Sequence, residues 1–212
     1  MIHMTFDKVQ FVYIDAAYLE YLNRKDSEIF FNKEDENYRL KPHLGILMNH
    51  AGRKYVIPLT SAKEKHKGWA DVTANWYRIY EVIDIKKNPV NRDDIIVEIK
   101  NQEILKKIKP EDRANVRQRI LSVLDIRKMF PVDDTVYTKV KFNISSNGSQ
   151  SDNQRTFLMI KEYNFLNELS EDIARKATKI YEKQIGKNKV LPYHCDYRKL
   201  EQALEEYKKE EK

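Results

Sequence analysis

The segment from Pro58 to His66 gathers the side chains best suited to chemistry at the end of an apolar run. It supplies two hydroxyls, two ammonium groups and an imidazole, which belong to Thr60, Ser61, Lys63, Lys65 and His66. An ammonium group binds phosphate oxygens as a point charge, a hydroxyl donates a hydrogen bond, and an imidazole titrates near neutral pH. The set suits a phosphodiester substrate. Residue types alone equally allow a solvated polar turn.

Motifs for other chemistries are absent from the sequence. The five glycines form no G-x-G-x-x-G and no P-loop, and neither H-E-x-x-H nor C-x-x-C occurs. The single Cys195 excludes an internal disulfide framework. A catalytic metal would need paired carboxylates, which only Asp93-Asp94 and Asp133-Asp134 offer. We therefore expect no metal and no cofactor.

Composition limits the class of protein. The chain has 212 residues with 39 Lys plus Arg against 33 Asp plus Glu, so the formal net charge is +6. This charge permits a nucleic-acid partner without proving one. Charged residues make up 34% of the chain, no apolar run approaches the ~20 residues of a spanning helix, and no signal peptide is evident. We expect a cytoplasmic protein with one domain over residues 1–212 and no membrane contact.

The first half of the chain predicts strands that place the polar segment. Val9–Ile14 is typical of a strand, and Asp15 is expected to cap a helix that ends near Arg24. His43–Asn49 and Lys54–Leu59 predict a hairpin that leads into the polar segment. Trp76–Asp84 predicts a further strand, whereas residues 26–40 suggest a surface loop.

The second half predicts mainly helices. Leu105, Ile108 and Ile120 hint at helix between residues 91 and 119, before strands expected over 121–130 and 136–142. A loop is expected over 143–153. The apolar period over 154–184 predicts one long helix that Gly186 ends, followed by a last helix over 197–208. Strands first and helices last predict an α+β fold with an antiparallel sheet.

Four stretches together resemble the ToxN/AbiQ family, the endoribonuclease toxins of type III toxin–antitoxin systems and abortive phage resistance. They are Phe11–Asp15 with Tyr18–Leu22, Lys41–Ile46, Tyr55–His66, and Cys195–Tyr197 with Leu200–Glu201. The third matches a "PLTS-x-K-x-x-H" pattern of the family and is the most specific. The resemblance leaves out an apparent insertion near residues 86–118 and the loop at 143–153.

The resemblance implies a compact, strongly twisted antiparallel sheet flanked by helices, similar to the MazF-like toxins. It also implies metal-independent RNA cleavage by attack of the 2′-OH, which leaves a 2′,3′-cyclic phosphate and a 5′-OH. Ser61 and Lys63 match the central family pair, with Thr60 beside them. Lys41 matches the family lysine that precedes the "x-x-x-G" strand, and His66 matches the last residue of the motif. Lys41 and Lys63 are expected to line the phosphorane, and a lysine or His66 to serve as acid or base.

The resemblance further implies residues that contact RNA. Tyr38 is one residue off an upstream family tyrosine, and Tyr163 lies about one turn after Ile160, where the family has a tyrosine. Tyr197 fits either base stacking or helix packing. Basic side chains that suit RNA phosphates are Lys65, Lys106, Lys107, Lys109, Arg113, Arg117, Arg119, Lys176, Lys179 and Lys183.

The implied partner is a small repeated RNA antitoxin that folds into pseudoknots and is cut from its precursor by the toxin. Toxin and RNA would assemble in a closed complex, and the substrates would be cellular or phage RNA. Two other interpretations stay open. One is an RNA-binding module without catalysis, and the other is a metal-dependent nuclease built on the paired aspartates.

Overall fold

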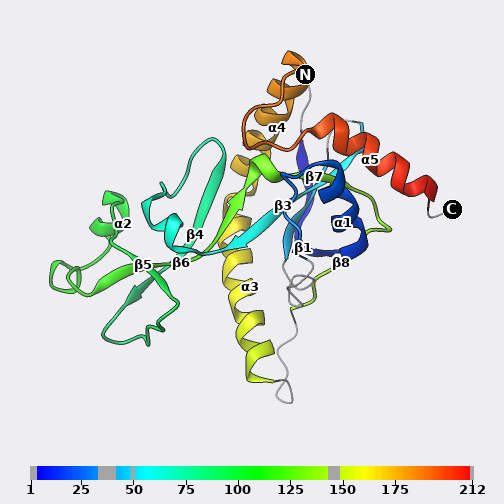
Figure 1. Cartoon of the computed structure of the whole chain (residues 1–212). Helices are drawn as coiled ribbons and strands as arrows, with labels where there is room; N and C mark the ends of the chain where they lie inside the picture. Colours follow the sequence, from blue (N-terminus) through cyan, green and yellow to red (C-terminus); the bar gives the residue numbers. More distant parts are fainter. Residues whose placement is uncertain (1–3, 33–41, 49–50, 143–148, 211–212) are drawn as a thin grey trace.

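The computed structural model describes residues 4–32, 42–48, 51–142 and 149–210. Within them, eight strands form one antiparallel sheet, and five α-helices accompany it. The strand order is β4-β6-β3-β2-β1-β8, with β5 paired to β6 and β7 paired to β3 (Figure 1). The predicted α+β class with an antiparallel sheet is confirmed. None of the helices described is long and apolar enough to cross a membrane.

The first half of the chain follows the sequence-based expectation. Strand β1 (Thr5–Ile14) leads into helix α1 (Ala16–Lys25), and the Asp15 carboxylate accepts from the first-turn amides. Strands β2 (His43–Met48) and β3 (Lys54–Ser61) form the predicted antiparallel hairpin. The polar segment is not entirely beyond the strand, because Thr60 and Ser61 are the last residues of β3.

The middle of the chain holds more strand than predicted. The elements are β4 (Trp76–Asp84), β5 (Ile95–Val97), α2 (Gln102–Lys106), β6 (Val116–Asp125), β7 (Phe130–Val132) and β8 (Tyr137–Lys139). The helical hint at Ile120 was wrong, since this residue lies in β6 opposite Tyr80. The strand expected over 121–130 is interrupted by a 3-10 turn at Ile126–Lys128, which Asp125 caps. Pro131 lies within β7 rather than ending a strand.

Three helices close the fold: α3 (Gln150–Glu168), α4 (Ser170–Lys187) and α5 (Tyr197–Glu210). The last agrees with the prediction. The single long helix does not, because the chain breaks at Leu169, where the backbone leaves helical geometry. The helical spacing of apolar residues continues across this break, so the sequence pattern does not reveal it. Gly186 lies inside α4, and the left-handed Asn188 (φ 47°) ends that helix. Residues 150–153, expected in a loop, begin α3.

The core lies between the sheet and helices α1, α3, α4 and α5, and buried tyrosines contribute much of it. Gly45 on β2 allows close strand packing, since a Cβ there would lie 3.0 Å from a Val56 methyl and 3.3 Å from Val12. The stretch from 86 to 118 contains β5 and α2. Figure 1 shows both at the opposite end of the molecule from α1 and α5, joined to the rest through β4 and β6.

Candidate active site

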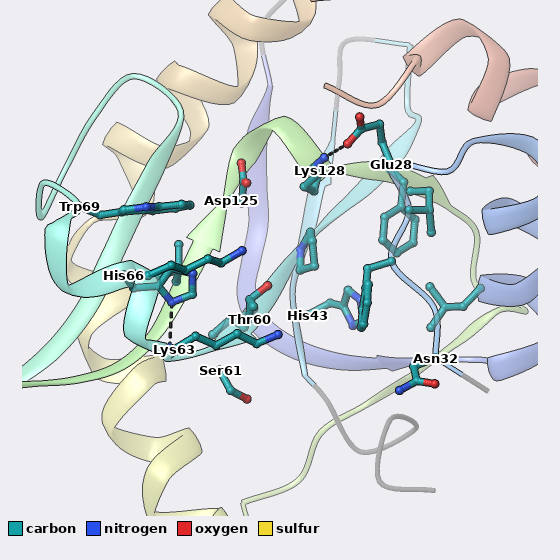
Figure 2. A pocket seen from close by; sticks show the side chains of 18 residues that line it. Glu28, Asn32, His43, Thr60, Ser61, Lys63, His66, Trp69, Asp125 and Lys128 are labelled. Carbon is teal, nitrogen blue, oxygen red and sulfur yellow. Dashed lines mark hydrogen bonds and ion pairs between the residues drawn. The ribbon is translucent and has the colours of Figure 1, made fainter. Parts of the chain in front are cut away.

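A cavity of about 440 Å³ lies where β3 ends. The five side chains that the sequence singled out in the polar segment all line it: Thr60, Ser61, Lys63, Lys65 and His66. The remaining walls come from α1 and the segment after it, from β2 and from β6 (Figure 2). The structure therefore brings the predicted hydroxyl and ammonium groups together. Their chemical roles stay predictions.

The two hydroxyls point in different directions. Thr60 is paired with Val123 and Ser61 with Ser122, so successive side chains alternate across the sheet. Figure 2 shows the Thr60 hydroxyl directed into the cavity and the Ser61 hydroxyl directed away from it. Of the residues expected to converge on one phosphate, Thr60 and Lys63 have side chains directed into the cavity (Figure 2). Ser61 stands at the rim.

A short 3-10 helix, Glu64–Gly68, fixes the backbone beside the cavity. The amide of Lys63 donates to Nδ1 of His66 at 3.0 Å, and the amide of His66 donates to the carbonyl of Lys63 at 2.8 Å. These reciprocal bonds hold the turn closed. They leave the Lys63 side chain directed across the cavity, as Figure 2 shows.

The environment of His66 favours the neutral ring. The side chain is only 2% exposed, and burial is the main cause that lowers its pKa, with the charges of Lys65, Lys63 and Arg78 adding to it. Since Nδ1 accepts from an amide, the proton of the neutral ring resides on Nε2. The ring nitrogen that a base would use is therefore already occupied.

Arg78 is a buried supporting residue that sequence analysis missed. Its side chain is 5% exposed and donates from Nη1 to the carbonyls of His66 and Lys67, at 3.2 and 3.3 Å. Nε donates to Asp71 at 2.9 Å, and the two side chains form an ion pair. The available signal was an arginine within the run Trp-Tyr-Arg-Ile-Tyr.

Other groups that line the cavity were not anticipated either. They are Trp69, which directly follows the 3-10 helix, the carboxylate of Asp125, and the ion pair between Lys128 and Glu28 (Figure 2). Asp125, Lys128 and Glu28 are distant in sequence from the polar segment, so no local motif signals them.

Two predicted tyrosines lie away from this cavity, and two further predicted positions are outside the part of the chain that the structure describes. Tyr38 and Lys41 lie outside the described residues. Tyr163 is partly buried, donates to the carbonyl of Val9 at 3.2 Å and packs against the ring of Phe11. Tyr197 is fully buried and stacks on Tyr181, so helix packing, and not base stacking, is its role in this structure.

The predicted basic residues do not line this cavity, apart from Lys65. Lys106 pairs with Glu103, and Arg117 donates to the carbonyls of Ala114 and Val116. Lys176 pairs with Asp172 and lies 4.2 Å from the ring centre of Tyr77. Lys107, Arg113 and Lys179 are exposed.

Three of the four paired aspartates, the alternative basis for a nuclease, are engaged with cations. Asp94 lies 3.5 Å from Arg119, Asp133 lies 3.3 Å from Lys208, and Asp134 lies 2.6 Å from Lys54. Across the described ranges, no group of three or more His, Cys, Asp or Glu is placed to hold a metal ion.

Comparison with known proteins extends over nearly the whole chain. Residues 10–205 match the family described as toxin ToxN of type III toxin–antitoxin systems. The chain is 26% identical to the endoribonuclease ToxN of Bacillus thuringiensis subsp. kurstaki over 209 residues, 95% of this chain and 86% of that protein. It is 32% identical to the endoribonuclease ToxN of Pectobacterium atrosepticum over 74 residues, 34% of this chain and 43% of that protein.

Solved structures share the fold. A type III toxin described with selective inhibition by a non-coding RNA pseudoknot gives a TM-score of 0.64 at 23% identity. AbiQ, a lactococcal anti-phage endoribonuclease, gives 0.64 at 20% identity. Each alignment covers 95% of this chain and 99% of the other. The family match over residues 10–205 shows that the chain belongs to the ToxN toxin family of type III toxin–antitoxin systems.

Proposed function

We propose that this protein is a metal-independent endoribonuclease toxin. The observation that carries the proposal is the cavity at the end of β3, where Thr60 and Lys63 converge on one space. The 26% identity to an endoribonuclease over 95% of the chain supports the same activity. Preorganised cations and hydroxyl donors are what a dianionic phosphorane requires, and each typically contributes ~10²–10³-fold to the rate.

In the proposed reaction, the 2′-oxygen of the RNA attacks the adjacent phosphorus. The new 2′-O–P bond forms as the P–O5′ bond breaks, which gives a 2′,3′-cyclic phosphate and a 5′-OH. The 2′-OH proton passes to a base, and the departing 5′-oxygen receives a proton from an acid. Lys63 and Lys41 stabilise the added charge, while Thr60 donates a hydrogen bond to a phosphate oxygen; Ser61, at the rim, would donate to the RNA only where the chain leaves the cavity. Lys65 contacts the neighbouring phosphate.

His66 is a positioning residue in this proposal rather than the base. Its ring is buried, its pKa is lowered, and Nδ1 is committed to the Lys63 amide. The ring thereby fixes where the Lys63 side chain begins. A lysine is the remaining base among the alternatives that the sequence left open.

The partner that we propose is a small repeated RNA antitoxin folded as a pseudoknot, bound in a closed toxin–RNA complex. A related toxin is described as selectively inhibited by an RNA pseudoknot. Exposed cations on this chain, among them Lys107, Arg113 and Lys179, suit phosphate contacts. Since each phosphate contact releases counterions, affinity for such an RNA should fall steeply with salt.

The test is cleavage of RNA by purified protein in EDTA, with Lys63→Ala beside the wild type. Lys67→Ala is a matched control, because Lys67 belongs to the same 3-10 helix, pairs with Glu64 at 2.9 Å and does not line the cavity. We expect fragments with 2′,3′-cyclic phosphate ends from the wild type and the control, and at least a hundredfold slower cleavage by Lys63→Ala.

Other results would contradict the proposed activity or one of its residue assignments. Intact RNA that still shifts in a native gel would establish a binding module without catalysis. Cleavage that EDTA abolishes would establish a metal-dependent nuclease. Ser61→Ala at the wild-type rate would remove Ser61 from the site and leave the proposed activity standing.

A further inference from the structure

The cavity is larger than phosphate binding requires. Its volume of about 440 Å³ lies in the range of pockets that bury a small organic ligand. The polar segment occupies one side only, whereas apolar side chains including Leu19, Ile29 and Val123 line much of the rest. A nucleobase has apolar faces and lies next to a phosphate in RNA, so it suits an apolar space beside a phosphate site.

Trp69 adds a fixed aromatic surface to the lining of the cavity. Its amide donates to the carbonyl of His66 at 3.2 Å, so the residue is anchored to the 3-10 helix. The His66 ring lies 4.8 Å from the indole at 65°, and the Trp76 ring lies 4.6 Å from it. The guanidinium of Arg127 lies 5.2 Å from the Trp76 ring. These ring contacts hold the indole in place, and it lines the cavity (Figure 2).

Asp125 places an oriented carboxylate in the same cavity. Oδ1 accepts from the amide and Nε of Arg127 at 3.1 and 2.8 Å, and Oδ2 accepts from Nη2 at 2.7 Å. Each carboxylate oxygen accepts about two hydrogen bonds, so Oδ2 retains capacity for another donor. Because Arg127 links Asp125 to Trp76 and Trp76 supports Trp69, the carboxylate and the indole form one connected unit.

We propose that Trp69 and Asp125 form a nucleobase subsite, in which an unpaired base next to the cleaved phosphate stacks on Trp69 and presents an amino edge to Asp125. The proposal rests on the endoribonuclease function proposed above and adds the substrate feature that the site selects. Single-stranded RNA is recognised by stacking on aromatic rings together with hydrogen bonds to base edges.

The carboxylate decides which bases fit. Adenine, cytosine and guanine carry an amino group that donates to Oδ2 of Asp125. Uracil offers only N3–H, which two carbonyl oxygens flank, and these oxygens repel a carboxylate. The subsite should therefore prefer amino-bearing bases to uracil by roughly tenfold, the size of one well-placed edge contact.

Tryptophan fluorescence tests the proposal directly, since the chain has only two tryptophans. Trp76→Phe leaves Trp69 as the sole tryptophan, and Trp69→Phe leaves Trp76 as its matched control. The probes are short oligonucleotides of 2′-O-methyl adenosine, cytidine or uridine, which lack the attacking hydroxyl. Anisotropy of a labelled probe measures saturation independently of the indole signal.

We expect saturating adenosine or cytidine oligomer to quench Trp69 strongly and to leave the emission of the Trp69→Phe protein nearly unchanged. Trp69→Ala should weaken binding roughly tenfold or more, in line with the loss of one stacked base. Asp125→Asn should abolish the preference over uridine while stacking persists.

Saturated binding without quenching of Trp69 would overturn the subsite, and so would equal affinity for uridine. Cleavage of unmodified RNA by the wild type in a parallel assay would then show that the endoribonuclease proposal survives. Binding with quenching but without cleavage by the wild type would support the subsite and refute the nuclease.

Discussion

The backbone amide of Lys63 donates a hydrogen bond to Nδ1 of His66, three residues further along the chain, at 3.0 Å. This contact links Lys63, whose side chain is directed across the cavity in Figure 2, to a ring that is 2% exposed. A neutral imidazole with Nδ1 occupied holds its proton on Nε2. The histidine of the motif thus shapes the turn from which Lys63 reaches the cavity.

Replacing His66 separates a positioning role from acid–base catalysis. The amide oxygen of asparagine lies as many bonds from Cβ as Nδ1 does, so His66→Asn preserves an acceptor for the Lys63 amide. Leucine fills a similar volume and accepts nothing. We expect His66→Asn to cleave RNA within about tenfold of the wild type, and His66→Leu to be at least ~10²-fold slower because Lys63 is misplaced.

Single-turnover cleavage measured from pH 5 to pH 9 gives the decisive comparison. The His66→Asn protein should retain the pH profile of the wild type, since the ring is not the titrating catalyst. Equal and severe loss in both variants, together with the disappearance of one limb of the profile, would make His66 the acid or base.

Arg78 should stabilise the same turn through its hydrogen bonds to the carbonyls of the 3-10 helix. Arg78→Ala would leave the carbonyls of His66 and Lys67 without these bonds and Asp71 without its partner. Removing one member of a largely buried ion pair typically costs about 3 kcal/mol or more of unfolding free energy. Urea denaturation should show this loss, whereas Arg92→Ala, an exposed control, should change stability by less than about 0.5 kcal/mol.

Arg78→Lys refines the test, because a lysine keeps the charge but cannot reach two carbonyls and a carboxylate together. We expect a stability between the wild type and Arg78→Ala, with slower cleavage at a temperature where the protein stays folded. Wild-type cleavage by Arg78→Lys would show that the 3-10 helix does not need this support.

Local signals were sufficient for part of the site. Thr60, Lys63 and His66 lie within one contiguous motif, so a strand that ends beside them brings them together without any long-range information. Asp125 faces the same cavity from the end of β6, and only the pairing of β3 with β6 reveals that. A single sequence contains no such pairing signal.

Other predictions were wrong because one sequence pattern is compatible with two structural arrangements. The apolar period through Leu169 fits one helix or two consecutive helices on the same core, and the structure has two. An aromatic residue at a helix start, such as Tyr197, fits a core or an RNA surface equally well, and it is buried here. The β-branched Ile120 belongs to a strand because β4 and β5 pair with β6 on either side.

Glu162 on α3 should make stability depend on pH. The carboxyl group is 4% exposed and faces the hydroxyl of Ser122, and burial raises its pKa to about 7. The folded state therefore binds the proton more tightly than the unfolded state does, whose glutamate titrates near 4.5. Stability from this group is full below pH 4.5 and is lost as pH rises through 7.

Glu162→Gln removes this titration while it keeps a polar side chain of similar shape. Between pH 5 and pH 8, urea unfolding should show the wild type losing up to about 3 kcal/mol relative to the variant. Glu168→Gln, an exposed control on the same helix, should follow the wild type at both pH values. Other titrating groups, including His66, are common to all three proteins and cancel in the difference. Parallel pH dependence of wild type and Glu162→Gln would mean that the Glu162 carboxylate is solvated when it ionises.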